Sequence, residues 1–335
     1  MNKPLLSICI PTYNRAEYLE KSLDSLVNQE SFSQIEVVIS DNCSTDGTQI
    51  LCERFCKEHA NIHYYRNAEN IHDRNFPTVL MRANGVFRKL YNDNMIHFAG
   101  ELLYLLTLLE KYQKSRPFLF FLHGKIGVKK QKNEVCEFQS LDQLVLRTSH
   151  HFTWISAFGF WEEDCVHFDT TFDLCDTKIW QSYTGLKNAD ERKKIVIVSK
   201  KMIDWLPVKN RDYSYGLYTV FFTNFPELLG QYVDSKKLSA KTLYAVRKHL
   251  LFNLAGGWIG NAGKNTSADF GNQSDFMKLI FADYRKEWYY PAFRIWREYS
   301  LGKKKLFIGM KNCIGQSFVG RKMLSVKRKL NLKLY

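Results

Sequence analysis

Two apolar segments that each end in a polar loop constrain the fold of this chain more strongly than any other feature. Residues 5–10 (LLSICI) run into the loop 11–15 (PTYNR), and residues 35–39 (IEVVI) run into Asp41 and the segment 46–48 (DGT). Short apolar runs of this kind, the first with a helix-breaking proline behind it, are typical of buried parallel strands. Ligands of open α/β sheets bind at the carboxyl ends of such strands, so the two loops predict a nucleotide crevice.

Helical segments separate the strands and complete an alternating pattern. Residues 16–28 place Leu19, Leu23 and Leu26 on one helical stripe, and Asp46 is a predicted N-cap of the next helix. Strand and helix in alternation predict a doubly wound α/β fold with a mostly parallel central sheet flanked by helices. The remaining elements expected in this region are strands at 62–66, 86–91, 118–122 and 195–198, helices at 75–83 and 100–113, a surface hairpin at 125–137, and a helix begun by Ser140 as a capping box.

The pattern becomes helical after residue 210, with helices expected at 217–229, 240–255 and 275–288. We therefore expect a catalytic domain over residues 1–230 and a helical C-terminal region over 231–335. Residues 283–335 hold fourteen Lys or Arg against three acidic residues, a net charge of 14 − 3 = +11 out of +14 for the whole chain. The basic surface is thus predicted to belong to this C-terminal tail.

Cysteine usage and hydropathy limit the class of protein. The eight cysteines show no repeated CxxC spacing, which argues against a zinc ribbon or a disulfide scaffold. The first strand begins so early that we expect no signal peptide, and no run of about 18 apolar residues is present to span a bilayer. These features predict a protein of the reducing cytoplasm.

Four stretches in the first part of the chain carry a resemblance to a known family. They are SICIPTYNR, VVISDNCSTDGT, NIHDRNFPTVLMRANGVF and LYNDN. In order and spacing they resemble family 2 glycosyltransferases, which have the GT-A fold, and the form with Arg74-Asn75 is similar to the abequosyltransferase-like subgroup. The resemblance implies an inverting enzyme that moves a sugar from a nucleotide-sugar donor to a glycan acceptor, one expected to be lipid-linked, in bacterial surface polysaccharide synthesis (lipopolysaccharide or capsule).

A nucleotide-sugar donor requires hydrogen-bonding partners for its base and ribose and counter-charge for its diphosphate. Asp41 at a strand end can accept from a base N–H, and the loop 12–15 can wrap the base or ribose. The alternatives are a loop-capping carboxylate at Asp41 and a simple turn at Asn14-Arg15. The expected donor-binding residues are Pro11, Thr12, Tyr13, Asn14, Arg15, Asp41, Asn42, Arg74, Asn75 and Asn92.

The segment LYNDN stands at the position of the family's Asp-x-Asp motif, and the resemblance implies a divalent cation, Mn²⁺ or Mg²⁺, held there. Asp93 is the acidic residue of this segment, and Asn94 supplies an amide oxygen, so we predict these two as metal ligands. The cation would stabilise the charge of the departing diphosphate. Two alternatives stay open: a base such as Arg74 or Lys89 neutralises the diphosphate, or the segment is an Asx turn.

An inverting transfer needs a general base for the acceptor hydroxyl. FDTTFDLCDTKIW is similar to the family segment in which an acidic residue opens a short helix, so Asp176 is the first candidate and Asp173 the second. A helix cap or a solvated surface position is the alternative for either residue. A set of histidines and aromatics lines either the acceptor pocket or the core: His150, His151, Trp154, Phe158, Phe160 and Trp161.

The C-terminal tail, residues 283–335, mixes aromatic and apolar residues with its cations. Such a composition favours contact with an anionic membrane surface, which would suit a lipid-linked acceptor and would place the protein at the inner face of the plasma membrane. A solvated tail and nucleic-acid binding are the alternatives, and we expect no nucleic-acid partner. Two other functions remain possible at this point: a catalytically silent nucleotide-sugar-binding protein and a basic nucleic-acid-binding protein.

Overall fold

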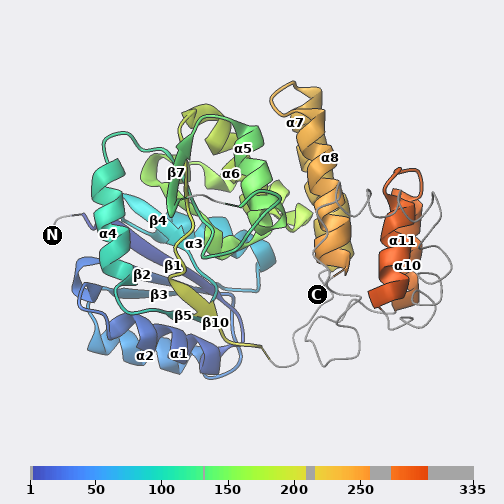
Figure 1. Cartoon of the computed structure of the whole chain (residues 1–335). Helices are drawn as coiled ribbons and strands as arrows, with labels where there is room; N and C mark the ends of the chain where they lie inside the picture. Colours follow the sequence, from blue (N-terminus) through green and yellow to red (C-terminus); the bar gives the residue numbers. More distant parts are fainter. Residues whose placement is uncertain (1–2, 131–132, 209–215, 257–272, 301–335) are drawn as a thin grey trace. The chain divides into compact units, whose positions relative to one another are not determined.

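The computed structural model describes residues 3–130, 133–208, 216–256 and 273–300 of the chain (Figure 1). The chain divides into two compact units, residues 1–247 and 248–335. The expected boundary between residues 230 and 231 remains a prediction. In the described residues, none of the helices combines the length and the apolar character that a membrane span requires.

A five-stranded sheet forms the centre of the first unit, in the order β3-β2-β1-β4-β8. Four neighbouring strands are parallel, and β8 is antiparallel to β4 at the edge. This confirms the predicted α/β fold with a mostly parallel sheet flanked by helices. The bounds are β1 Leu6–Thr12, β2 Glu36–Asp41, β3 Ile62–Arg66, β4 Phe87–Leu90 and β8 Gly159–Trp161, with α1 Ala16–Val27, α2 Thr48–Glu58 and α3 Asn75–Arg82 between the parallel strands.

Two smaller sheets complete the first unit. A three-stranded sheet runs β6-β9-β7, and an antiparallel two-stranded ribbon joins β5 to β10. The predicted hairpin over 125–137 is wrong for the described residues, because β7 pairs with the distant β9 and no strand forms within 125–130. The bounds are β5 Met95–His97, β6 Phe118–Phe121, β7 Val135–Phe138, β9 Ile195–Val198 and β10 Ile203–Trp205, with α4 Glu101–Tyr112, α5 Leu141–Thr148 and α6 Trp180–Arg192.

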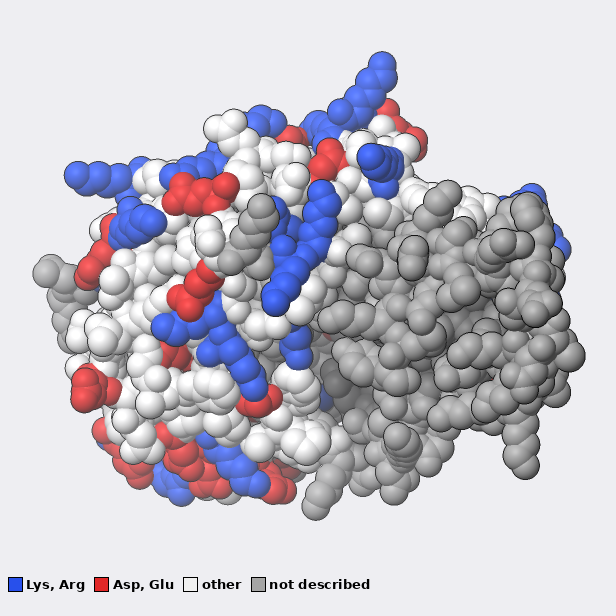
Figure 2. All heavy atoms as spheres, viewed as in Figure 1, with Lys and Arg blue, Asp and Glu red and all other residues white. Residues whose placement is uncertain are grey.

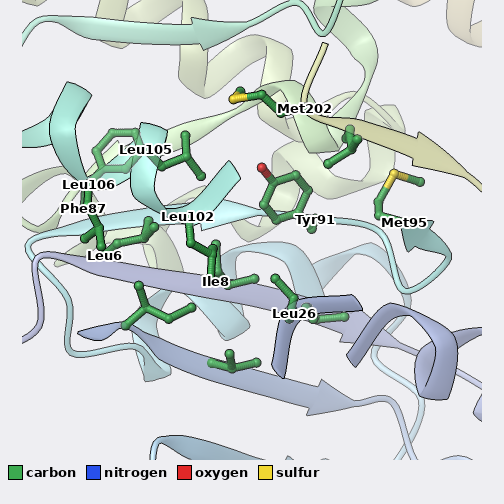
Figure 3. Packing of buried hydrophobic residues seen from close by; sticks show 14 of the residues in the cluster. Leu6, Ile8, Leu26, Phe87, Tyr91, Met95, Leu102, Leu105, Leu106 and Met202 are labelled. Carbon is green, nitrogen blue, oxygen red and sulfur yellow. The ribbon is translucent and has the colours of Figure 1, made fainter. Parts of the chain in front are cut away.

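The core of the first unit lies on both faces of the central sheet. All seven residues of β1 are buried, as a continuous apolar strand between two helical layers must be. Figure 3 shows Leu102 and Leu105 of α4 packed over Leu6 and Ile8 of β1. Because such side chains are close-packed, truncating one of them to alanine costs about 2–5 kcal/mol of stability.

The helix N-termini depart from the sequence predictions at two positions. The N-cap residue of α2 is Gly47 and not the predicted Asp46. The Asp46 side chain still contacts both helix starts: its Oδ1 accepts from the backbone N–H of Thr48 (3.0 Å), and its Oδ2 accepts from that of Ala16 (3.1 Å). The predicted capping box at Ser140 is wrong. Ser140 makes no side-chain cap bond, and Asp142 in the same turn accepts from Ser239 instead.

The later helices are α7 Phe225–Asp234, preceded by the π-helical turn Thr219–Asn224, and α8 Ala240–His249, followed by the π-helical turn Leu250–Ala255. In the second unit α10 spans Gln273–Tyr284 and α11 spans Tyr290–Ser300. The second unit has an aromatic core in which Phe293 is buried against Phe252 and Trp296. Gly256 lies so close to the Trp296 ring that an added Cβ would lie 2.4 Å from it, so this glycine is required by packing.

Candidate active site

The two loops that the sequence singles out lie side by side at the carboxyl ends of β1 and β2. Thr12 pairs in register with Asp41, the last residue of β2. Beyond them, Asn14 Oδ1 accepts from the N–H of Thr45 (2.7 Å), and the N–H of Asn14 donates to Ser44 Oγ (2.8 Å). Asn14 has φ +51°, a left-handed conformation that asparagine tolerates better than most residues. The loops are therefore bound to each other before any ligand arrives.

Asp41 is fully buried beneath these loops and is surrounded by protein donors. Its carboxylate accepts from Ser44 N–H (2.9 Å), from the Tyr64 hydroxyl (2.7 Å) and from Arg66 Nη1 (3.2 Å). Burial and the neighbouring Asp41 raise the pKa of Tyr64, which keeps its hydroxyl a donor. This geometry is that of a loop-capping carboxylate, and contact between Asp41 and a base stays a prediction.

Asp93 connects the loop after β4 to the loop after β1. Its Oδ2 accepts from Thr12 Oγ1 (3.0 Å), and its Oδ1 forms an ion pair with Arg15 Nη1 (3.0 Å). Asp93 is only 3% exposed, and burial raises its pKa, although the charge of Arg15 and the hydrogen bonds act in the opposite direction. Three residues predicted from two separate motifs thus form one contact cluster.

The neighbours of Asp93 are anchored on opposite sides. Asn92 is bound by Ser156, which lies 64 positions later in the chain. Asn94 donates its amide to the carbonyl of Leu206 (2.7 Å), and Leu206 N–H returns a bond to Asn94 (2.9 Å). The bond from Leu206 goes to the backbone carbonyl of Asn94, so the side-chain oxygen Oδ1 takes part in neither bond. The described residues contain no group of three or more His, Cys, Asp or Glu arranged to hold a metal.

Asn42 and Asn75, both predicted to bind donor, are buried behind the loops. Asn75 donates to the carbonyl of Ser40 (2.8 Å), and Asn67 donates to the side-chain oxygens of both Asn42 (3.0 Å) and Asn75 (3.2 Å). Arg82 completes the cluster by donating to Ser40 and Asn67. These amides hold the end of β2 and the start of α3 in place, which positions the exposed residues around them.

Other predicted donor residues lie at the surface. Tyr13 is exposed, and so is Arg74 at the end of the 3-10 turn η2 (His72–Arg74), where its guanidinium lies 5.9 Å from the ring centroid of Phe172. Pro11 is buried within β1. Arg74 is thus the predicted cation that solvent and ligands can reach, at the side of the loops where α3 begins.

Both candidate bases lie on one 3-10 helix, η6 (Phe168–Thr177), and both carboxylates, Asp173 and Asp176, are exposed. This helix packs against η2 and α3, the elements that carry Arg74 and Asn75. The structure therefore places the acidic segment next to the predicted donor residues of η2 and α3, and it assigns neither carboxylate a role.

Some side chains with open alternatives lie too deep to contact a ligand. Lys89, considered as a counter-charge for the diphosphate, is fully buried and donates to backbone carbonyls, so that alternative is wrong. Phe158, Phe160 and Trp161 are core residues rather than pocket-lining ones. His150, His151 and Trp154 are half-buried, so their exposure does not distinguish a position in the core from one in an acceptor pocket.

One exposed aromatic residue beside the Asp93 loop was not among the predicted site residues. Trp205, at the end of β10, pairs with Met95 of β5, and its side chain is 48% exposed. Lys125 Nζ lies 3.9 Å from the ring centroid. The strand Ile-Asp-Trp is too short to show the alternation of apolar and polar residues that predicts a strand. The β5–β10 ribbon that places Trp205 beside the Asp93 loop therefore could not be predicted from the sequence.

Comparisons with known proteins agree with this arrangement. A family model described as glycosyl transferase family 2 matches residues 7–125, which include both loops and the Asp93 segment. Residues 7–125 therefore resemble glycosyltransferase family 2 in sequence. The solved structures that resemble this chain include TarS 1–349 of S. aureus, with a TM-score of 0.55 and 15% identity over 79% of this chain and 76% of that one, which shows a shared GT-A-like fold.

Curated relatives match the same N-terminal region. The abequosyltransferase RfbV of Salmonella typhimurium is 42% identical over 109 residues, 32% of this chain and 33% of the relative. A GalNAc(5)-diNAcBac-PP-undecaprenol beta-1,3-glucosyltransferase of Campylobacter jejuni is 30% identical over 137 residues, 40% of this chain and 42% of the relative. The chain spans a third to a half of the length of these proteins, so its donor sugar and its acceptor are matters of proposal.

Proposed function

We propose that this chain is a family 2 glycosyltransferase that moves a sugar, with inversion, from a nucleotide-sugar donor to a glycan acceptor of bacterial surface polysaccharide synthesis. One observation carries the proposal: Asp93 is hydrogen-bonded to Thr12 and Arg15, so residues 81 and 78 positions apart form one polar edge. Relatives named as an abequosyltransferase and as a glucosyltransferase of an undecaprenol-linked glycan support it, as do the structures of TarS 1–349 with UDP and UDP-GlcNAc.

The donor base and ribose are assigned to the loop around Tyr13, Asn14 and Arg15, with Asp41 holding that loop from below. Arg74 faces solvent at the start of α3 and supplies counter-charge for the diphosphate. A planar guanidinium suits phosphate because it can donate two parallel hydrogen bonds. Thr12 and Asn92 complete the rim of the donor site.

A divalent cation, Mn²⁺ or Mg²⁺, is assigned to Asp93 and Asn94. Carboxylate and amide oxygens are hard ligands of the kind both ions prefer, so the donor set fits such an ion. The bound cation would supply stabilisation of the negative charge on the leaving diphosphate. Asp93 forms an ion pair with Arg15. When a cation binds, either this ion pair breaks or the carboxylate contacts the cation and the guanidinium together.

The general base is assigned to Asp176, with Asp173 as the second candidate. Deprotonation of the acceptor hydroxyl requires a carboxylate that the hydroxyl can reach, and both residues are exposed on η6. On the acceptor side we add Trp205, because sugar rings pack on aromatic faces and this indole is accessible beside the Asp93 loop.

Membrane association is assigned to the C-terminal tail, residues 283–335, most of which lies outside the described residues. The described part of the second unit exposes several large apolar side chains, Leu279 and Phe281 on α10, Trp288 in the turn after it and Ile295 on α11. On the face of the molecule shown in Figure 2, Lys and Arg alternate with Asp and Glu over the first unit, in keeping with its small net charge. Apolar groups with excess cations favour an anionic lipid surface, such as the inner face of the plasma membrane.

Vesicle sedimentation tests this membrane assignment. The full chain should pellet with phosphatidylglycerol vesicles and not with phosphatidylcholine vesicles, and replacing Lys303, Lys304 and Lys305 by alanine should weaken the binding. Tighter binding to duplex DNA than to the anionic vesicles would instead favour the nucleic-acid alternative.

A ligand screen followed by a transfer assay tests the function itself. Thermal unfolding of the full chain is measured with UDP-, GDP-, CDP- and TDP-linked sugars, with and without MnCl₂, because a ligand of the native state raises its apparent stability. We expect at least one donor class to raise the midpoint and to support transfer to a lipid-linked glycan fraction. Binding without transfer or donor hydrolysis would indicate a silent nucleotide-sugar-binding protein, and no binding at all would overturn the proposal.

A further inference from the structure

Lys89 is a charged side chain with 0% exposure, on β4, four positions before Asp93. Its Nζ donates to the carbonyl of Ser156 and to those of Leu90 (3.2 Å) and Phe158 (3.3 Å). Burial lowers its pKa from 10.5 to about 7. A buried amine is costly unless its donors are satisfied, and here three carbonyl oxygens satisfy them.

The partners of Lys89 form a segment that ends at the donor site. Ser156 belongs to the one-turn 3-10 helix Ile155–Ala157 and is fully buried. Its carbonyl accepts from Lys89, while its hydroxyl donates to Asn92 Oδ1 (2.6 Å) and accepts from the N–H of Asn92 (3.0 Å). One residue therefore links the buried lysine to the residue that directly precedes Asp93.

A second bond holds the same segment to β4. The carbonyl of Phe158 accepts from the backbone N–H of Leu90 (3.1 Å) as well as from Lys89. Residues 156–158 are thus hydrogen-bonded to the last residues of β4 and to Asn92, the first residue of the Asn92–Asn94 loop. An apolar side chain of the same length would fill the space but could not donate to the carbonyls, so the amine itself is required.

We propose that Lys89 and Ser156 are positioning residues that fix Asn92, and through it the Asp93 carboxylate, for the diphosphate of a nucleotide ligand. The inference rests on the proposed function and adds two buried residues that do not touch the ligand. Removing the link leaves the loop folded but free to move, and a site held less rigidly binds its ligand more weakly.

Ser156→Ala tests the link because it deletes only the hydroxyl and keeps the carbonyl that Lys89 uses. Ser22→Ala is the matched control: Ser22 is also fully buried, and its hydroxyl has no hydrogen-bond partner within the part of the chain that the structure describes. Binding of UDP, GDP and CDP to each full-length protein is measured by calorimetry with MnCl₂ present, together with thermal unfolding. We expect Ser156→Ala to weaken binding of the tightest nucleotide about tenfold, because both hydrogen bonds between the hydroxyl and Asn92 are lost and the loop is held less rigidly.

A double-mutant cycle separates positioning from general destabilisation. If Ser156 acts through Asn92, the losses in the double variant Ser156→Ala/Asn92→Ala should be less than additive, because Asn92→Ala already removes the bond to Oδ1 and leaves only the bond from the backbone N–H of residue 92. Equal nucleotide affinities for Ser156→Ala, Ser22→Ala and the wild type would overturn the inference while leaving the proposed function standing. Additive losses in the cycle would also overturn it. A wild-type protein that binds none of the three nucleotides would overturn the inference and the proposed function together.

Discussion

The carboxylates of the candidate site fall into two regions with opposite environments. Asp41 and Asp93 lie at the strand ends, are almost completely buried, and accept hydrogen bonds from named donors. Asp173 and Asp176 lie on η6 and are exposed to solvent. The strand-end region is preorganised, because its polar groups are oriented by the protein before a ligand binds.

This difference separates what each region can do. A buried carboxylate with fixed partners can hold a charge or a loop at a defined place, but it is poorly placed to take up a proton from a large, diffusing acceptor. An exposed carboxylate can reach the acceptor hydroxyl, yet only the bound substrate defines its geometry. Donor binding is accordingly assigned to the first region and proton abstraction to the second.

The largest expected effect distinguishes the two exposed carboxylates. Asp176→Asn should lower kcat by about 10²- to 10⁴-fold, because it removes the base and keeps the shape, while nucleotide binding stays unchanged. Asp173→Asn is the matched variant on the same helix and should leave kcat within a few-fold of the wild type. Steady-state kinetics with the donor and acceptor varied separately measure both, and the reverse ranking would move the base to Asp173.

The buried region should respond differently. Asp93→Ala should lower transfer about 10²- to 10³-fold and abolish the dependence on Mn²⁺ or Mg²⁺, because it removes the charged ligand and releases Arg15. Asp24→Ala, at an exposed position of α1, is the control and should behave as the wild type. Transfer rates are titrated with MnCl₂ after treatment with EDTA. A metal-dependent, fully active Asp93→Ala protein would show that the cation binds elsewhere.

A smaller effect is expected at the edge of the site. Trp205→Ala should raise the acceptor KM about tenfold with little change in the donor KM, since an aromatic face in contact with a sugar contributes on the order of 1 kcal/mol. Trp205→Phe should recover part of the loss because it keeps an aromatic face. Initial rates at varied acceptor concentration provide the measurement, and an unchanged acceptor KM in Trp205→Ala would remove Trp205 from the acceptor site.

The strand-end region was predictable from sequence because its signals are local. The continuous apolar run of β1 and the polar loop behind it specify a buried parallel strand with a ligand edge, and the structure has both. The partners of Asp93 could also be anticipated in part, because Thr12 and the Asp93 loop follow neighbouring strands. Local pattern and tertiary arrangement agree there.

The features that could not be predicted depend on pairings between distant segments. The sequence indicates Lys89 only as a polar residue of a mixed strand. Its burial comes from the antiparallel pairing of β4 with β8 and from the ring of Phe121 on β6, 4.7 Å from Nζ. Trp205 reaches the Asp93 loop only because β10 pairs with β5. Asp46 was expected to be the N-cap of α2, but it lies one residue before that position and accepts from the first backbone N–H of both α2 and α1. Hydrophobic periodicity within one short stretch of sequence does not predict such long-range contacts.

An effect of a different kind, on the pH dependence of stability and not on transfer, is expected from Lys89. Burial lowers its pKa from 10.5 to about 7, so between these values the unfolded chain binds a proton that the folded chain has largely released. The contribution of Lys89 to the free energy of unfolding therefore rises with pH between about 7 and 10.5, and it is lost as the pH falls toward 7. Lys89→Met should flatten the rise, whereas Lys57→Met, at an exposed position of α2, should preserve it.

Urea unfolding at pH 7, 8 and 9 measures the slopes for the wild type and both variants. Subtracting the Lys57→Met profile from that of Lys89→Met isolates the buried amine from every other group that titrates in the same range. If the Lys89→Met and wild-type profiles are parallel, the amine stays charged in the core. The carbonyls of Ser156 and Phe158 would then satisfy a full positive charge, and the preorganised region would tolerate more charge than its burial implies.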